Sequence, residues 1–159
     1  MTSAATITHI NVSNGGVPKL PIERAVIGVL GVEGDRQAST EFHGGPERAL
    51  CLFSLERIEA LQAEGHPIGP GGAGENITIT GLDWDAVGPG TQMRLGDAVL
   101  IEITRYTAPC TKIQANFSDG DFNRINQKTN PGWSRAYAKV IEGGPLLPGD
   151  TVELLPAAG

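Results

Sequence analysis

Ala98-Val99-Leu100-Ile101-Glu102-Ile103-Thr104-Arg105-Tyr106 is the stretch of sequence that decides the fold. Side chains alternate across a β-strand, so Val99, Ile101 and Ile103 fall on one face together with Arg105. Three apolar residues on that face point into a core, and the fourth position holds a cation near the end of the strand. We therefore expect a half-buried strand packed on an apolar interior.

The loop after this strand, Thr107-Ala108-Pro109-Cys110, delivers a lone cysteine. Pro109 fixes its own φ and biases Ala108 towards an extended conformation, so the loop is stiff. A thiol held close to a cation at the mouth of a core is favoured as a thiolate. The loop predicts that Cys110 is a metal ligand or a nucleophile.

Size and composition limit the class of protein. We expect residues 1–159 to form a single domain that buries its core without disulfides. The formal net charge of −6 argues against nucleic acid as a partner, because phosphate neutralisation needs concentrated Lys and Arg. The sequence lacks a signal peptide and a long apolar run, and it has only two cysteines, so we expect a cytoplasmic protein away from membranes.

Short strands and tight turns dominate the rest of the chain. A helix is expected at Leu55–Glu64, because Ser54 is a typical N-cap and Gly65 a typical residue after a helix end. Shorter helices are expected near Asp121–Gln127 and Gly132–Lys139. The other expected strands are Thr6–Val12, Arg24–Leu30, Ala49–Phe53, Asn76–Thr80, Met93–Leu95 and Thr151–Leu155. This pattern predicts a mostly β fold, an antiparallel β-barrel with a few peripheral α-helices.

Three familiar kinds of site fit the sequence poorly. The segment Gly69–Gly74 satisfies G-x-G-x-x-G, but a helix precedes it and a β-branched strand follows, the reverse of a dinucleotide site. The cysteines and histidines lack the paired spacing of a zinc site. A Cys–His protease built from Cys110 and His43 would need a pairing that the sequence does not show, and Cys51, inside an apolar strand, is expected to be a buried hydrophobe.

Several short motifs together carry a resemblance to a known family. They are Gly15-Gly16-Val17-Pro18-Lys19, Gly34-Asp35-Arg36, His43-Gly44-Gly45-Pro46, Gly74-Glu75-Asn76-Ile77-Thr78, Gly96-Asp97 and Pro109-Cys110. In this order and spacing the chain resembles the stand-alone bacterial members of the MOSC domain family, which is named after the C-terminal domain of molybdenum-cofactor sulfurases. Each motif is short, but the ordered combination is specific and runs from about Gly15 to Val152.

The resemblance implies a β-barrel similar to that of pyruvate kinase, with a pocket for the molybdenum cofactor, a molybdopterin. It implies that Cys110 supplies a thiolate to molybdenum, which suits a soft sulfur ligand. Arg36 would contact the cofactor phosphate and Asn76 the pterin ring. The cofactor-binding residues that the resemblance implies are Lys19, Asp35, Arg36, His43, Gly44, Gly45, Gly74, Glu75, Asn76 and Arg135.

Two positions depart from the pattern of the membrane-attached reductases of this family. Those relatives have a second cysteine three residues before the metal ligand, where this chain has Thr107. They also have a basic residue near the matching asparagine, where Gly74 stands. We expect the contacts to the phosphate to be rearranged accordingly.

The function that the resemblance implies is a molybdenum-dependent oxidoreductase acting on small N-hydroxylated compounds such as hydroxylaminopurines and amidoximes. His43 or Arg105 would orient substrate or transfer a proton beside Cys110. Two cysteines are too few for an iron–sulfur cluster, so electrons would come from a separate flavoprotein or ferredoxin-type partner. Two alternatives stay open: a sulfur carrier with a persulfide on Cys110, and a cofactor-binding protein without turnover. The sequence leaves the oligomeric state open.

Overall fold

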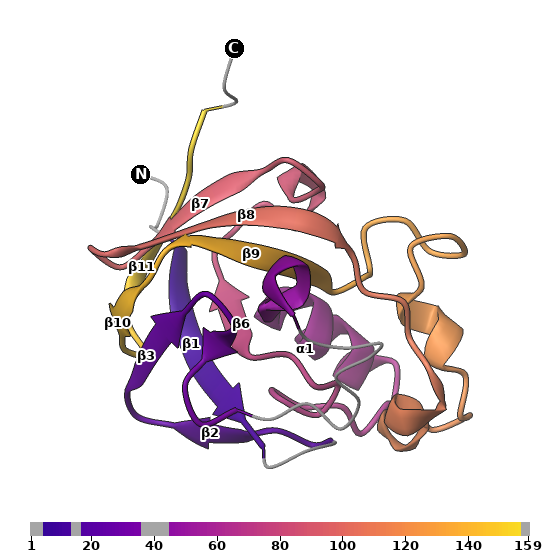
Figure 1. Ribbon diagram of the computed structural model, residues 1–159. Coiled ribbons are helices and arrows are strands. Elements are labelled where there is room, and N and C mark those ends of the chain that lie inside the picture. The colour runs from indigo at the N-terminus through magenta and orange to yellow at the C-terminus, as the bar shows by residue number, and fades with distance from the viewer. Residues whose placement is uncertain (1–4, 14–16, 36–44, 157–159) are drawn as a thin grey trace.

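The computed structural model of the chain describes residues 5–13, 17–35 and 45–156. Its strands form a closed barrel with a small sheet at one side (Figure 1). The strands follow one another around the barrel in the order β11 (Thr151–Leu154), β7 (Gln92–Leu95), β8 (Val99–Tyr106), β9 (Ala136–Glu142), β5 (Leu50–Ser54), β6 (Ile77–Thr80) and β1 (Ala5–Val12). Pairing of β1 with β11 closes the ring. The prediction of a mostly β protein with a barrel is confirmed.

Most strand pairs in the barrel are antiparallel, as expected, and one is parallel. The parallel pair is β5 with β6. These two strands are connected through the helix α1 (Leu55–Ala63), because a parallel pair needs a long crossover rather than a hairpin. The short strand β2 (Leu20–Ile22) extends the sheet beyond β1. The separate sheet contains β10 (Gly144–Leu146), β3 (Ala25–Gly28) and β4 (Gly31–Val32).

The helix α1 begins and ends where the sequence predicts. The side chain of Ser54 accepts a hydrogen bond from the backbone N–H of Arg57 at 3.2 Å, which is the N-cap interaction. At the other end Gly65 has φ +98°, a left-handed conformation that glycine adopts without strain. Ile58 and Leu61 are fully buried, so the expected apolar stripe packs on the barrel.

Two predicted helices are corrected by the structure. The segment predicted as a helix at Gly132–Lys139 instead contains the start of β9, in which Ala136 and Ala138 face the core at the two-residue period of a strand. Near Asp121–Gln127 the chain forms only a short 3₁₀-helix, η4 (Phe122–Ile125). The other 3₁₀-helices in the described ranges are η1 (Pro46–Arg48), η2 (Trp84–Ala86) and η3 (Thr111–Asn116).

The core lies inside the barrel and between the barrel and α1. Val99, Ile101 and Ile103 of β8 are completely buried there, as their alternation predicts. The segment after β8 carries η3 and η4 along one side of the barrel, on the right in Figure 1, whereas β3 and β10 lie on the opposite side. Among the helices that the structure describes, none is both long and apolar enough to cross a membrane.

Candidate functional site

A β-bulge in β8 places Arg105 next to Tyr137 of β9. Ile103 pairs with Ala138, but the register then shifts so that Arg105, two residues on, pairs with Tyr137. Directly paired residues share a face of the sheet, and Tyr137 alternates with the core residue Ala138, so the bulge moves Arg105 off the core face. Arg105 is accordingly exposed, although simple alternation in the sequence places it on the same face as the buried isoleucines.

The helix η1 brings a second arginine to Tyr137. The hydroxyl of Thr104, the extra residue of the bulge, donates to the backbone carbonyl of Glu47 at 2.6 Å and so attaches η1 to β8. The guanidinium carbon of the next residue, Arg48, lies 5.6 Å from the centre of the Tyr137 ring, which is cation–π geometry. The bulge therefore serves two purposes, since it turns Arg105 outward and anchors the segment that carries Arg48.

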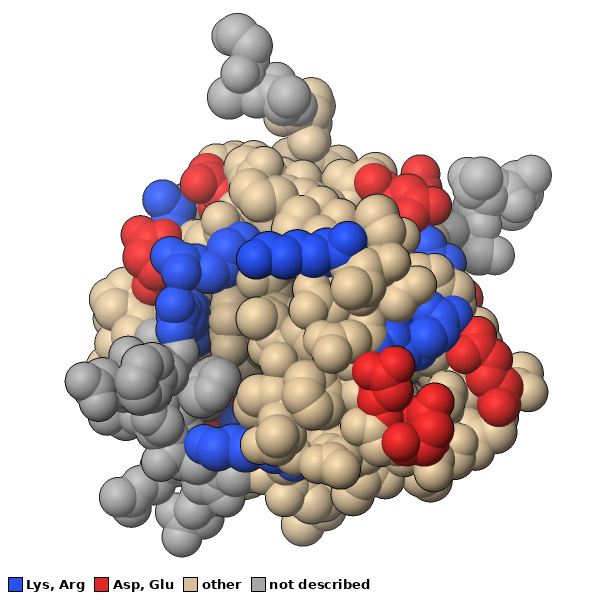
Figure 2. Space-filling view, turned by 90° about the vertical axis from the view of Figure 1, so that its right-hand side faces the viewer, with Lys and Arg blue, Asp and Glu red and all other residues tan. Residues whose placement is uncertain are grey.

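The hydroxyl of Tyr137 lies within electrostatic reach of both thiols and two guanidinium groups. The pKa of Tyr137 is raised to about 12: burial is the largest cause, Cys51 and Cys110 also act to raise it, and Arg135 and Arg48 act to lower it. We call Arg48, Arg105 and Arg135 the arginine cluster. Figure 2 views the molecule from the side that carries η3 and η4, and a band of Lys and Arg side chains crosses this face.

Cys110 lies at the start of η3, at the end of a loop that is fixed to the barrel. The backbone N–H of Thr107 donates to the carbonyl of Arg135 at 2.9 Å, and the carbonyl of Cys110 accepts from Ile113 N–H at 3.2 Å. Ile113 is buried, which holds the first turn of η3 in place. Cys110 itself is half-buried, whereas Cys51 is buried.

Arg135 carries a buried positive charge that has the Glu75 carboxyl within electrostatic reach but no carboxylate at ion-pair distance among the described residues. Its side chain is 6% exposed, and Nη1 donates a hydrogen bond of 2.6 Å to the backbone carbonyl of Ala73. Its Nε finds no acceptor in the described part of the chain. A buried donor without an acceptor is costly, and an anionic group bound at this position would satisfy it.

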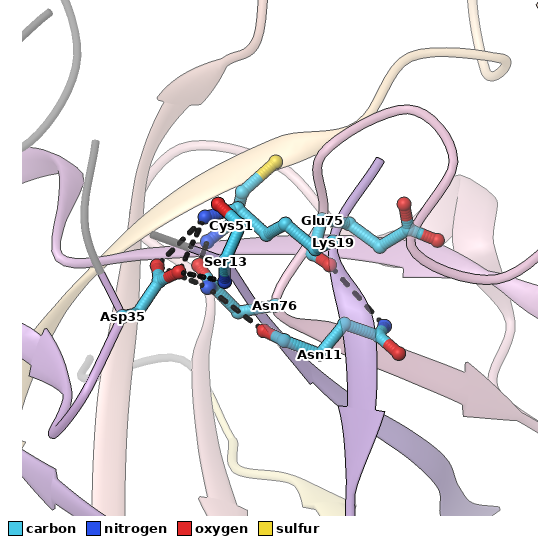
Figure 3. Close-up of polar contacts among 7 residues, drawn as sticks. All are labelled: Asn11, Ser13, Lys19, Asp35, Cys51, Glu75 and Asn76. Atoms are coloured by element: carbon cyan, nitrogen blue, oxygen red, sulfur yellow. Dashed lines mark hydrogen bonds and ion pairs between the residues drawn. The ribbon is translucent and has the colours of Figure 1, made fainter. Parts of the chain in front are cut away.

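A second polar cluster joins β1, β6 and the loops beside them (Figure 3). The carboxylate of Asp35 accepts two hydrogen bonds from Lys19 Nζ, at 2.7 and 2.8 Å, and one from Asn76 Nδ2 at 2.7 Å. The backbone N–H of Ser13 donates to the same carboxylate at 2.9 Å. The Lys19 and Asp35 side chains are each only 5% exposed, so this is a buried ion pair. We call Lys19, Asp35 and Asn76 the ion-pair cluster.

The amide of Asn76 is engaged entirely within the protein. Its Oδ1 accepts from the backbone N–H of Cys51 at 3.0 Å, and Nδ2 also donates to the carbonyl of Asn11 at 3.3 Å. These bonds connect β5 with β1 across the end of β6. In this structure Asn76 and Lys19 therefore hold protein groups, and the contacts predicted for them with a pterin and a phosphate stay a prediction.

Glu75 is a completely buried carboxyl group beside this cluster. Burial raises its pKa from 4.5 to about 7, although backbone N–H groups and Arg135 act in the opposite direction. One carboxyl oxygen accepts from the Thr78 hydroxyl at 3.3 Å. The other oxygen, Oε1, has no partner within the described ranges, and nor does Oδ1 of Asn11. Glu75 is therefore a group that can hold a proton near neutral pH.

The glycine-rich loop 69–74 connects the two clusters through its backbone. The carbonyl of Gly71 accepts from Lys19 N–H at 2.9 Å, and the adjacent carbonyls of Gly72 and Ala73 accept from Asn116 and Arg135. Gly71 has φ +79°, and a Cβ there would lie 2.2 Å from the Lys19 carbonyl oxygen, so only glycine fits. The loop contacts other backbone closely and thereby positions Arg135, a role different from binding a dinucleotide.

The remaining predicted site residues are distributed as follows. Arg36, His43 and Gly44 lie outside the described residues. Gly45 has φ +80° and leads directly into η1. Gly74, with φ +86°, allows close approach of Val17, since a Cβ there would lie 2.9 Å from its Cγ1.

Cys51 is buried, as expected for a residue inside an apolar strand. Burial raises the pKa of its thiol, and its sulfur lies 3.6 Å from the Thr107 hydroxyl oxygen. A thiol with a raised pKa in a closed site is a poor nucleophile and a poor metal ligand. Of the two cysteines, only Cys110 is therefore available for chemistry.

Two residues of this site, Tyr137 and Arg48, are absent from the sequence-based candidates. Tyr137 falls in the segment that the sequence analysis predicts as a helix. The signal for a strand there is the alternation of small apolar Ala136 and Ala138 on either side of Tyr137. Arg48 directly follows the Gly44-Gly45-Pro46 motif and precedes an apolar strand, and that proximity was the available signal.

Comparison with known proteins reveals relatives in bacteria and fungi. The chain is 32% identical over 142 residues to an uncharacterized protein, YflK, of Bacillus subtilis, covering 88% of this chain and 63% of YflK. It is 32% identical over 130 residues to a protein named reductase of Gibberella moniliformis, covering 79% of this chain and 22% of that protein. The chain thus spans less than two thirds of the length of these curated relatives.

Solved structures share the fold. The crystal structure of YiiM from Geobacillus stearothermophilus superposes with a TM-score of 0.76 at 25% identity, covering 96% of this chain and 75% of that chain. In sequence, residues 39–153 match the model of the MOSC domain. That match covers the apolar strand β5, the ion-pair residue Asn76, the bulge in β8 and the Cys110 loop, and the chain belongs to the MOSC domain family.

Proposed function

We propose that this chain binds the molybdenum cofactor beside the arginine cluster, with Cys110 as a thiolate ligand of molybdenum, and reduces small N-hydroxylated compounds. Membership of the MOSC family supports a role with this cofactor. A relative that is named a reductase supports an oxidoreductase role in general terms. The substrate class, such as hydroxylaminopurines and amidoximes, is the specific part of the proposal.

The observation that carries the proposal is the half-buried thiol of Cys110 together with the buried guanidinium of Arg135, both within electrostatic reach of Tyr137. Molybdopterin carries a phosphate and holds its metal through sulfur. A guanidinium pairs with phosphate through two parallel hydrogen bonds, and a thiolate is a soft ligand of the kind such a metal prefers. Arg135, with an Nε that lacks an acceptor among the described residues, fits the phosphate, and Cys110 fits the metal.

The reaction divides between cofactor and protein. When bound, the molybdenum centre supplies a two-electron change of oxidation state and an open coordination position. Cleaving the N–O bond of a hydroxylamine consumes two electrons and two protons and yields the amine and water. The exposed Arg105, whose backbone pairs with that of Tyr137, orients the polar substrate.

The proposal is tested with protein expressed in a molybdenum-replete host. Bound molybdenum and pterin are quantified, and turnover of 6-N-hydroxylaminopurine is measured anaerobically with reduced methyl viologen. Cys110→Ser should lower kcat by at least about 100-fold because the metal loses its protein ligand. Cys51→Ala is the matched control, since it removes the other sulfur, which is buried. Equal turnover by Cys110→Ser and the wild type would contradict the proposal.

The same experiment distinguishes the proposed reductase from the alternative function, a sulfur carrier. The half-exposed position of Cys110 would also suit a persulfide that is passed to another protein. Mass spectrometry of the intact protein detects the added sulfur. Persulfide on Cys110, together with no turnover of any N-hydroxylated compound by cofactor-loaded protein, would favour the carrier.

A further inference from the structure

Two buried side chains beside the glycine-rich loop each leave one polar atom without a hydrogen bond. Arg135 is 6% exposed and its Nε has no acceptor, and Glu75 is fully buried and its Oε1 has no donor, among the residues that the structure describes. The guanidinium and the carboxyl group are within electrostatic reach of each other, yet these two atoms do not satisfy one another. The pair therefore combines a buried donor of positive charge with a buried acceptor that can carry a negative charge.

The loop 69–74 and the strands beside it hold both side chains in place. Arg135 Nη1 donates to the carbonyl of Ala73 at 2.6 Å, and Glu75 directly follows this loop. The hydroxyl of Thr78 donates to Glu75 Oε2 at 3.3 Å, and Asn11 Nδ2 donates to the same hydroxyl at 3.2 Å. These contacts keep the carboxyl group near the guanidinium in either state of protonation.

The other charged or titratable groups in this region leave Arg135 as the partner of Glu75. The Cys51 thiol of β5 is within electrostatic reach of Glu75, but burial raises the pKa of this thiol and keeps it neutral. Lys19 is held by Asp35 at 2.7 Å, so its charge is already compensated (Figure 3). The ionisation of Glu75 is therefore coupled to the charge of Arg135.

We propose that Glu75 controls how tightly Arg135 binds an oxyanion, such as the phosphate of the cofactor, by gaining or losing a proton. An ionised Glu75 attracts the Arg135 guanidinium and repels the anion, whereas a protonated Glu75 does neither. Anion binding to protein with an ionised Glu75 therefore takes up a proton from solvent. This inference rests on the part of the proposed function that puts an anionic group at Arg135, and is independent of substrate reduction.

The direction of the pH dependence follows from the environment of Glu75. Burial raises its pKa to about 7, so without an anion the group is mostly protonated below this pH and mostly ionised above it. Affinity for an oxyanion of fixed charge should therefore be highest at acidic pH and fall as the pH rises through about 7.

Sulfate is the probe of choice because it keeps its double negative charge near neutral pH, whereas a phosphate group titrates there. Calorimetric titration of protein purified without cofactor should give a Kd for sulfate at least about fivefold higher at about pH 8.5 than at about pH 5.5. Glu75→Gln cannot ionise, so at the higher pH it should bind sulfate as tightly as the wild type does at the lower pH. The matched control, Glu59→Gln, removes an exposed carboxylate from α1 and should keep the pH dependence of the wild type.

Two further measurements locate the proton and the anion. Titrations in buffers with different heats of ionisation should show that the wild type takes up to about one proton per sulfate at about pH 7.5, and that Glu75→Gln takes up none. Arg135→Gln should abolish sulfate binding, because it removes the guanidinium.

The inference is overturned if the wild type binds no sulfate, or binds it equally at both pH values. Proton uptake that persists in Glu75→Gln, or sulfate binding that survives Arg135→Gln, also overturns it. Neither molybdenum content nor turnover enters these measurements. A protein that fails to reduce N-hydroxylated compounds can therefore still show the coupling, and a reductase can lack it.

Discussion

Arg105 of β8 and Tyr137 of β9 are paired residues, and a one-residue bulge is what brings them together. Without the bulge, Arg105 would continue the core face of Ile101 and Ile103, where a guanidinium would be buried without a partner. With it, Arg105 is exposed beside the tyrosine ring that Arg48 covers. The buried part of β8 thus ends at the bulge, and the residues after it form one edge of the candidate site.

The buried ion pair makes a direct prediction about stability. Asp35→Asn should lower the free energy of unfolding by about 3 kcal/mol, because it leaves the Lys19 ammonium buried without its counter-charge. Asp85→Asn is the control: Asp85 is 73% exposed and pairs with Arg57, so its loss should cost less than about 1 kcal/mol. Urea denaturation of the three proteins measures both effects. Similar midpoints for Asp35→Asn and Asp85→Asn would show that the buried pair contributes little.

Two glycines with similar backbone angles, Gly71 in the glycine-rich loop and Gly90 outside it, should differ in how much stability an alanine substitution costs. Gly71→Ala should destabilise by more than about 2 kcal/mol, since φ is +79° and the new Cβ would lie 2.2 Å from the Lys19 carbonyl oxygen. Gly90→Ala has the strained φ of +91° but open space around the Cβ, so we expect about 1 kcal/mol. Thermal unfolding followed by circular dichroism distinguishes them. Equal losses would mean that the close contact with Lys19 has no energetic consequence.

Glu75 predicts a pH dependence with a definite sign. Its pKa is raised from 4.5 to about 7, so between these values the folded protein holds a proton that the unfolded chain has released. The contribution of Glu75 to stability is therefore complete below about pH 4.5 and is lost as the pH rises to about 7.

Glu75→Gln, which keeps the shape and cannot ionise, should remove this dependence. From pH 4.5 to 7 the wild type should lose on the order of 3 kcal/mol relative to Glu75→Gln. Urea titrations at several pH values measure the difference. If the free energies of unfolding of the wild type and Glu75→Gln differ by the same amount at every pH in this range, the pKa of Glu75 is not raised in the folded protein.

The two thiols should differ strongly in reactivity. Cys110 is half-buried in a surface loop, whereas Cys51 is enclosed in β5, and reaching it needs local opening. The single-cysteine proteins, made as Cys51→Ala and Cys110→Ala, should therefore react with iodoacetamide at rates that differ by at least about 100-fold. Mass spectrometry of time points measures both. Comparable rates would place Cys51 at an accessible surface.

Much of the barrel could be predicted from the sequence because alternation in β8 and the caps of α1 are local signals. Ser54, Gly65 and the buried residues of β8 behave as their neighbours in sequence dictate. The predicted helix at Gly132–Lys139 was wrong because only cross-strand pairing with β5 and β8 makes that segment a strand.

The candidate site was harder to predict because its geometry depends on long-range contacts. The sequence shows that Lys19 is a cation and Asp35 a carboxylate, but it does not show that the two form an ion pair in the interior. Similarly, the position of Arg105 depends on a bulge, which a single sequence does not reveal. Tyr137 joins the site because β9 pairs with β8 across the bulge, and Arg48 joins it because η1 is attached to β8 through Thr104.

X-ray absorption at the molybdenum edge of the cofactor-loaded protein measures the sulfur atoms around the metal directly. If Cys110 is a ligand, the wild type and Cys51→Ala should show the same sulfur shell, and Cys110→Ser should show one sulfur neighbour fewer at unchanged pterin content. An identical sulfur shell in the wild type and Cys110→Ser would contradict the role assigned to this thiol.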